Sequence, residues 1–269
     1  HWLRVGKSRP RRHEVRQVRN ARDADARAKT DWILHCDADE FVWADPSVST
    51  TLAGAADHAD CLVIPVAERI GVPNKSIFDG AFRRPFREPH TTGCAVFGPD
   101  YDLTYRGLTG HAQGKAFVRC GRSLQMSIHR PHLGRSDADV VVERADPDAL
   151  ELLHFEGLTP AHWAFKLSRM VRALAEKDGM PPSKHRHRQA DALIEDPYGE
   201  AELYHRLKCP NDAIVNVLKS YDLWKAPAFD PSAALQRCFP DRAIDLAPQT
   251  IDKWLRRKKA HVLSYLRDD

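Results

Sequence analysis

One short segment constrains the fold of this chain more than any other: an apolar run that ends abruptly in a cluster of acids. Residues 32–36 (Trp-Ile-Leu-His-Cys) suit a strand covered on both faces, and Asp-Ala-Asp-Glu-Phe follows directly at 37–41. Ser47 is a typical N-cap for a helix expected to continue to about His58, and residues 61–66 suit a second buried strand. This order predicts a mixed or parallel α/β sheet, with 32–36 as a central strand and 61–66 next to it or nearby.

The rest of the chain divides into a loop-rich part and a helical part. Residues 71–121 are rich in glycine, proline and arginine, and a long loop in a compact domain is usually functional, so we expect them to bind substrate. Further strands are expected at 115–119 and 152–155. Helices are expected at 21–29, from Thr159–Pro160 to Gly179, and at 184–195, 200–208, 211–224 and 248–267. We therefore expect an α/β domain over residues 1–157 and a helical region packed on it over 158–269.

Composition limits the classes of protein and of partner. With 42% hydrophobic and 29% charged residues, the 269-residue chain has the balance of a soluble globular protein. The net charge of +4 suits a phosphate-bearing substrate, whereas the chain has no aromatic–basic pattern of a nucleic-acid-binding protein. No apolar run reaches the roughly 20 residues that span a bilayer. The six cysteines form no CxxC pair, which favours reduced thiols and a cytoplasmic location.

The acidic turn predicts a site for a hard divalent cation. If the extended geometry persists through the turn, Asp37 and Asp39 project to the same side of the carboxyl end of the sheet, where open α/β sheets bind ligands. Two carboxylates there suit Mg²⁺ or Mn²⁺, which complete their coordination with phosphate oxygens and water. A cation held in this way neutralises the charge of a departing diphosphate.

Three segments resemble bacterial family-2-like glycosyltransferases. Residues 31–41 are similar to their DW-(apolar)-D-x-DEF segment, and the softer matches are 110–119 with 128–131, and 152–155 with Phe165-Lys166. The resemblance covers roughly residues 20–170 and implies a GT-A-like, Rossmann-related mixed sheet flanked by helices. In that family a strand–helix–strand precedes the DxD motif, yet only 36 residues precede Asp37. We therefore expect a chain truncated at its N-terminus by about 60–80 residues.

The resemblance also implies an activity and the residues that perform it. Such enzymes move a sugar from a nucleotide-sugar donor to an acceptor hydroxyl on a saccharide or another molecule, with metal assistance and with inversion. The implied ligands of Mn²⁺ or Mg²⁺ are Asp37, Asp39, His154 and His129. Donor-binding residues are expected to be Asp37, Lys166 and Arg119. The general base that deprotonates the acceptor has three alternative candidates, Asp100, Glu88 and His111.

Other interpretations stay open at this point. One is a truncated, non-catalytic domain that binds a sugar or a partner. Another is a phosphatase of the haloacid-dehalogenase type with Asp37 as nucleophile, although its motif continues with threonine or valine rather than Glu40-Phe41. The basic run at 256–259 could contact a membrane surface, but a solvated helix face is the favoured interpretation. Zinc is not expected from the His-x-x-His at 129–132 or the His-x-His at 185–187, because neither has a matching pair of ligands.

Overall fold

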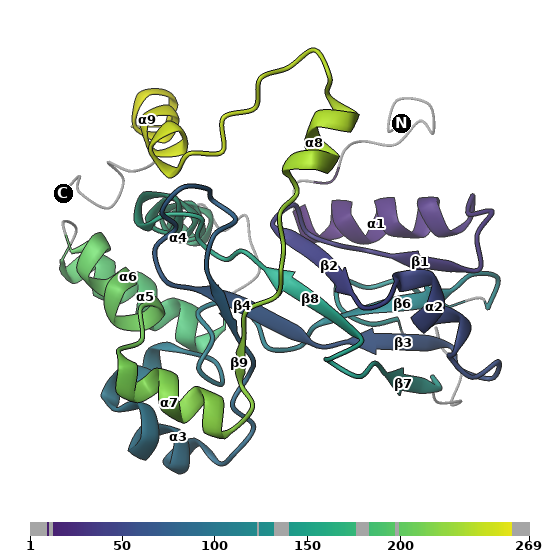
Figure 1. Cartoon of the computed structure of the whole chain (residues 1–269), viewed down its shortest axis with the longest axis horizontal. Coiled ribbons are helices and arrows are strands. Elements are labelled where there is room, and N and C mark those ends of the chain that lie inside the picture. Colours follow the sequence, from purple (N-terminus) through teal and green to yellow (C-terminus); the bar gives the residue numbers. More distant parts are fainter. Residues whose placement is uncertain are drawn as a thin grey trace. The chain divides into compact units, whose positions relative to one another are not determined.

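The computed structural model describes residues 10, 13–122, 124–131, 140–175, 183–196 and 199–259. The chain is mixed α/β and divides into two compact units (Figure 1). Unit 1 contains residues 1–66 and 113–152, and unit 2 contains 67–112, 153–176 and 180–269. The chain passes from unit 1 to unit 2 within β4 (Val66–Ile70) and again within β8 (Leu150–His154). Residues 67–112, expected to fold with the first 157 residues, therefore belong to unit 2.

Unit 1 is built on a mixed four-stranded sheet. Its strand order is β1 (Trp32–Leu34), β6 (Lys115–Arg119), β3 (Cys61–Ile64), β7 (Val142–Arg144). β6 is antiparallel to both of its neighbours, and β3 and β7 are parallel. Helix α1 (His13–Asp25) lies along this sheet in Figure 1 and buries Ala21 against Cys61, Val63, Ala116 and Val118. The strand expected at 115–119 is confirmed.

β1 lies at the edge of this sheet, so the expected central position of residues 32–36 is wrong. Among the described residues only β6 pairs with it, and its three residues are half-buried rather than covered on both faces. The apolar character of the segment has a local explanation. The Arg119 guanidinium lies 4.2 Å from the centre of the Trp32 ring, so a cation covers the face of this ring at the edge of the sheet.

Two further elements of unit 1 follow the acidic turn. β2 (Glu40–Ala44) is followed by Asp45, whose N–H donates to the Ala149 carbonyl just before β8. The Ser47 side chain accepts the Thr50 N–H and caps α2, which confirms the expected cap. The helix ends at Ala53 rather than near His58, because Gly54 takes the C-cap position. These elements leave the turn at 37–39 between two strands of the same unit.

Unit 2 combines three antiparallel strands with most of the helices. β5 (Ala81–Arg83) lies between β4 and β9 (Trp224–Lys225). The helices are α3 (His90–Phe97), the 3₁₀ helix η1 (Pro99–Leu103), α4 (Pro160–Ala175), α5 (Lys184–Glu195), α6 (Glu200–Lys208), α7 (Asp212–Ser220), α8 (Ser232–Cys238) and α9 (Pro248–Lys258). The expected bounds of α5 and α6 are confirmed, whereas α7 ends four residues early and α1 begins before the expected 21–29. Gly179 and residues 260–267 lie outside the described residues.

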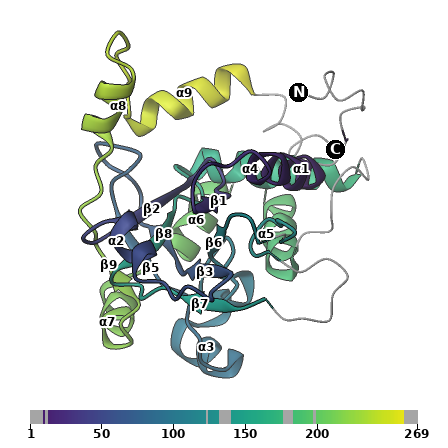
Figure 2. The same cartoon turned by 90° about the vertical axis from the view of Figure 1, so that its right-hand side faces the viewer.

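The core of unit 2 forms where α4 meets α5 and α6, and the three helices lie side by side in Figures 1 and 2. Trp163 and Leu167 are fully buried there against Leu193 and Tyr204, which confirms the apolar stripe expected on α4. The start of α4 depends on Gly157, whose φ is +68° and whose added Cβ would lie 2.7 Å from the Trp163 Cβ. Among the described residues, none of the helices combines the length and apolarity required to cross a membrane.

Candidate functional site

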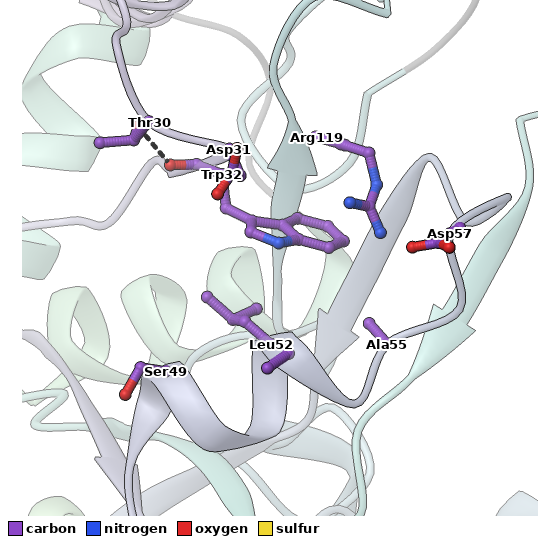
Figure 3. Close-up of a pocket in the computed structure, with 9 residues that line it drawn as sticks. Thr30, Asp31, Trp32, Ser49, Leu52, Ala55, Asp57 and Arg119 are labelled. Carbon is purple, nitrogen blue, oxygen red and sulfur yellow. Dashed lines mark hydrogen bonds between the residues drawn. The ribbon is translucent and has the colours of Figure 1, made fainter.

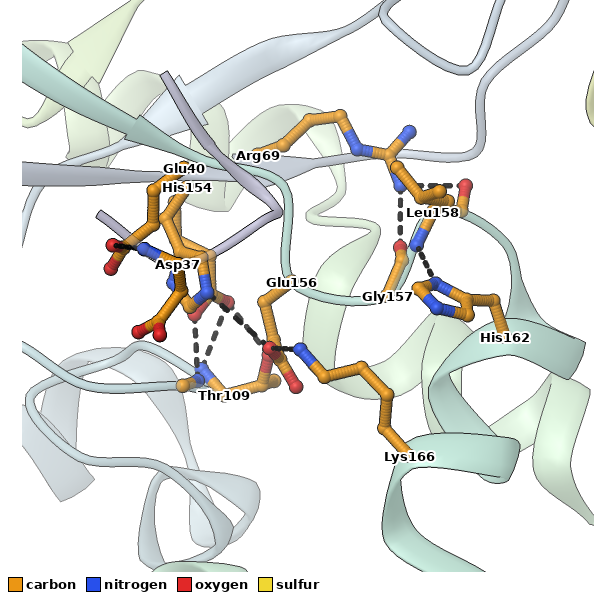
Figure 4. Close-up of polar contacts among 12 residues, drawn as sticks. Asp37, Glu40, Arg69, Thr109, His154, Glu156, Gly157, Leu158, His162 and Lys166 are labelled. Atoms are coloured by element: carbon orange, nitrogen blue, oxygen red, sulfur yellow. Dashed lines mark hydrogen bonds and ion pairs between the residues drawn. The ribbon is translucent and has the colours of Figure 1, made fainter. Parts of the chain in front are cut away.

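The acidic turn after β1 is closed by two hydrogen bonds between its ends. The Asp37 N–H donates to the Glu40 carboxylate at 2.7 Å, and the Glu40 N–H donates to the Asp37 carbonyl at 3.1 Å (Figure 4 shows the first). The extended geometry that would point Asp37 and Asp39 to the same side therefore does not persist through the turn, and strand alternation does not set their directions. The cause is Glu40, whose carboxylate accepts from the backbone three residues earlier and so stabilises a turn.

A buried lysine holds the first aspartate of the turn. The Lys115 ammonium, fully buried on β6, lies 2.8 Å from the Asp37 Oδ2 and 3.4 Å from the Glu40 Oε2. It also donates to the Ile128 carbonyl at 3.2 Å. From α1, the Gln17 amide donates to the other Asp37 oxygen at 2.9 Å. Each Asp37 carboxylate oxygen thus accepts from a different element, which fixes the side chain.

The turn carries more negative charge than Lys115 neutralises. Asp37, Asp39 and Glu40 supply three carboxylates within four residues, and Lys115 supplies one ammonium. Burial, and then the nearby Glu40 charge, raise the pKa of the Cys36 thiol to about 11, so this thiol is not a nucleophile at neutral pH. Asp39 is half-buried, and its hard oxygen ligands fit Mn²⁺ or Mg²⁺ better than a softer ion.

Of two further residues expected at the site, Arg119 lies elsewhere in unit 1 and His129 is held by backbone. Arg119 is four positions after Lys115 on β6, which corresponds to about 13 Å along a strand. Its guanidinium donates to the Ala56 and Ala59 carbonyls, both at 3.0 Å, and lines a pocket of about 430 Å³ beside Trp32 (Figure 3). The His129 ring is engaged with the Gly114 carbonyl, 3.1 Å from Nδ1. Arg119 therefore braces a loop, and His129 is fixed by backbone.

In unit 2, Glu156 contacts His154, one of the metal ligands expected from the sequence. Its buried carboxylate accepts from Lys166 and, at 2.6 Å, from Arg186, and it lies 3.4 Å from the His154 Nε2 (Figure 4). Burial alone would raise the pKa of Glu156, but Arg186 and then Lys166 outweigh it and hold that pKa well below its usual value. Glu156 is therefore anionic and orients the His154 ring, while Lys166 is the ion-pair partner of Glu156.

A second buried carboxylate, Glu68 on β4, lies in the same unit. It accepts from the Thr109 N–H at 2.9 Å, the Gly110 N–H at 2.6 Å and the Lys208 ammonium at 3.0 Å. Burial opposes ionisation, but Lys208 and then His154 outweigh it and lower the pKa of Glu68 to about 2. Burial also lowers the pKa of Lys208 to about 8, against the opposing effect of Glu68. These contacts hold the Thr109–Gly110 backbone just before His111.

The three candidates for the general base are in different surroundings. The His111 ring lies 5.0 Å, centre to centre, from the His154 ring. Asp100 is ion-paired with Arg206 through both of its carboxylate oxygens, and Glu88 is exposed just before α3. Of the three, only His111 lies beside another residue that the sequence predicted to be functional.

The buried carboxylates predict how stability depends on pH. The folded-state pKa of Glu68 is about 2, below its ordinary 4.5, so its contribution is complete above about pH 4.5 and is lost as pH falls toward 2. The pKa of Glu156 is also lowered, so its contribution to stability is likewise lost as pH falls. We expect Glu68 to contribute on the order of 3 kcal/mol of pH-dependent stability over that interval. Urea unfolding between pH 6 and pH 2.5 measures this, and Glu68→Gln should flatten the profile. An equally steep profile in that variant would assign the loss to other groups.

Sequence reasoning missed Lys115, Glu156 and the Glu68–Lys208 pair. A signal was present for Lys115, because a lysine directly before the apolar residues 116–118 of a buried strand needs a buried acid as partner. Glu156, two residues after the expected ligand His154, gave a weaker signal of the same kind. For Glu68 and Lys208 the sequence gave none, because the partners are 140 positions apart.

Comparisons with known proteins add no family to this description. No protein-family model, no curated protein and no solved structure matches the chain.

Proposed function

We propose that the chain is a nucleotide-sugar-dependent glycosyltransferase that holds a divalent cation at the acidic turn. The observation that carries the proposal is the build of the turn: Asp37 is fixed from α1 and β6, and Asp39 follows on a turn closed at both ends. Rigid placement of hard carboxylates at a strand end is what cation-assisted departure of a diphosphate requires. The edge position of β1 counts against the GT-A fold that the resemblance implies, so the proposal rests on the turn alone.

In this proposal the two aspartates have different roles. Asp39 supplies the oxygen that binds the cation directly. Asp37 is a positioning residue, because both of its oxygens already accept from Gln17 and Lys115. The cation, when bound, neutralises the charge that develops on the leaving diphosphate. Lys115 stabilises the turn by keeping Asp37 and Glu40 from repelling each other.

The resemblance to family-2-like enzymes adds His154 as a further ligand in the proposal. Support within unit 2 comes from Glu156, because a carboxylate beside a metal-binding imidazole fixes the ring and increases its basicity. His129 is the weaker candidate of the two, since its ring is engaged with the Gly114 carbonyl.

For the transfer step we assign the general base to His111. The acceptor oxygen attacks the anomeric carbon, the bond between that carbon and the diphosphate oxygen breaks, and the acceptor proton passes to the His111 imidazole. Neutral imidazole is a base of suitable strength at physiological pH. Asp100 is a poorer choice because both of its carboxylate oxygens already accept from Arg206.

A phosphatase with Asp37 as nucleophile is the alternative that shares most with this arrangement. A lysine next to the nucleophile would suit that chemistry also, so Lys115 does not discriminate between the two. The engagement of both Asp37 oxygens disfavours it, since one of them would have to attack phosphorus. The two reactions differ in their intermediates: only the phosphatase forms an acyl phosphate on Asp37.

The test combines product analysis with trapping of a phosphoenzyme. With a panel of nucleotide sugars and Mn²⁺, we expect release of nucleoside diphosphate that stops in chelator, and no phosphate on Asp37 after acid quench. Asp23→Asn, which removes an ion pair between Asp23 on α1 and Arg27 just beyond the end of that helix, is the matched control and should behave like the parent protein. A phosphorylated Asp37 would identify a phosphatase, and donor binding without turnover would identify a non-catalytic sugar-binding domain.

A further inference from the structure

Three side chains of unit 2 with metal-binding chemistry converge where α3 meets η1. His90 and Cys94 are one helical turn apart on α3, and Asp102 is on η1. The His90 Nε2 lies 3.0 Å from the Asp102 Oδ1 and 3.9 Å from the Cys94 Sγ, and one ligand atom from each residue lies within 4.8 Å of the others. None of the three belongs to the site proposed above for glycosyl transfer.

The separations are those of ligands around one small ion. Zn–N and Zn–S bonds of about 2.0 and 2.3 Å at a tetrahedral angle place nitrogen and sulfur about 3.5 Å apart, and nitrogen and oxygen about 3.3 Å apart. The separations of 3.9 and 3.0 Å in the structure are each within about 0.4 Å of those values. Small rotations of side chains that are half-exposed or exposed would complete the geometry without moving backbone.

The backbone that carries these side chains is held independently of them. A Cβ at Gly93 would lie 2.1 Å from the Tyr101 Cε1, so glycine lets α3 pack directly against that ring. Phe97 stacks on Tyr101 with ring centres 5.5 Å apart, and Asp100 on η1 is ion-paired with Arg206 on α6. The positions of α3 and η1 are therefore set by packing, and the ligands are preorganised.

We propose that His90, Cys94 and Asp102 bind a zinc ion. A thiolate with an imidazole selects zinc over Mg²⁺ or Mn²⁺, which prefer oxygen ligands. The Arg188 guanidinium donates to the Asp102 carbonyl at 3.0 Å and lies 3.5 Å from Oδ1, the same carboxylate oxygen that faces His90, so it holds the Asp102 side chain in place. Three protein ligands leave a fourth position for water or an external ligand, and the site is at the surface, where an ion can exchange.

Titration with Co²⁺, followed by competition with Zn²⁺, tests this proposal. We expect one tetrahedral Co²⁺ per chain, with a thiolate-to-cobalt charge-transfer band that zinc abolishes. Cys94→Ser should abolish that band, and His90→Ala should weaken binding by at least about a hundredfold. Cys238→Ser, at an exposed cysteine of α8, and Asp39→Asn should both retain the band, which separates this site from the acidic turn.

Two results would overturn the proposal. The first is a charge-transfer band that survives in Cys94→Ser, which would place the cobalt on another cysteine. The second is octahedral cobalt of equal affinity in the parent protein and in His90→Ala. Far-UV circular dichroism confirms folding of each variant, and retention of fold is expected because His90 is 63% exposed and Cys94 is half-buried.

Discussion

Replacing Lys208 with methionine should destabilise the protein by about 3–5 kcal/mol, because it leaves the Glu68 carboxylate buried without its cation. The Lys208 side chain is fully buried, and its ammonium donates to Glu68 at 3.0 Å and to the Thr109 hydroxyl at 3.2 Å. Methionine fills a similar volume, so the loss is electrostatic rather than a cavity effect. Urea unfolding at pH 7 measures it.

Two comparisons make this prediction specific. Lys253→Met, at an exposed lysine of α9, should change the free energy of unfolding by less than about 0.5 kcal/mol. The double variant Glu68→Gln, Lys208→Met should recover most of the loss, because no buried charge remains unpaired. The deficit of Lys208→Met should also shrink as pH falls and Glu68 becomes protonated. If Lys208→Met is as stable as Lys253→Met, the Glu68–Lys208 pair is not buried.

Asp39→Asn should lower kcat/KM for Mn²⁺-dependent sugar transfer by at least about a hundredfold. The substitution keeps the shape of the side chain but removes the anionic oxygen that holds the cation against the leaving diphosphate, a loss of several kcal/mol in the transition state. Stability should change little, because relief of repulsion between neighbouring carboxylates offsets lost hydrogen bonds. Kinetics at saturating Mn²⁺ and urea unfolding of the same preparation separate the two effects.

The contrast with Asp37 tests the division of roles within the turn. Asp37→Asn keeps only one oxygen for the two donors Gln17 and Lys115 and removes the charge that pairs with Lys115, so it should weaken stability as well as activity. Full activity of Asp39→Asn in the presence of chelator would show that the acidic turn does not hold a cation needed for activity. Equal losses of stability in the two variants would show that Asp39 is as structural as Asp37.

Local patterns in the sequence were sufficient for the elements whose stability is local. The bounds of β6, α5 and α6 follow from apolar periodicity and composition, and the Ser47 cap from its residue type. Missed elements such as α3 and β5 are short segments within the loop-rich 71–121, where periodicity gives no signal. The edge position of β1 was not predictable, because the arginine that covers Trp32 comes from a strand more than 80 residues later.

The candidate site was predictable as a motif but not as a geometry. The Asp-Ala-Asp segment identifies the turn, yet the shape of the turn is set by Glu40. The position of the Asp37 carboxylate is set by Lys115 and Gln17 from distant segments. Buried ion pairs such as Glu68–Lys208 depend on the tertiary structure in the same way. Residue types thus indicated which chemistry to expect, and the partners of each charge had to come from the fold.

Cation binding at the turn is measured most directly by electron paramagnetic resonance of Mn²⁺, because the sextet of the free aqueous ion loses amplitude on binding. Titrated with Mn²⁺ alone, so that no nucleotide competes for the ion, the parent protein and Asp23→Asn should bind the ion equally. Asp39→Asn should leave most of it free, while Cys94→Ser should bind it like the parent protein. Undiminished Mn²⁺ binding by Asp39→Asn would contradict a cation site at the acidic turn.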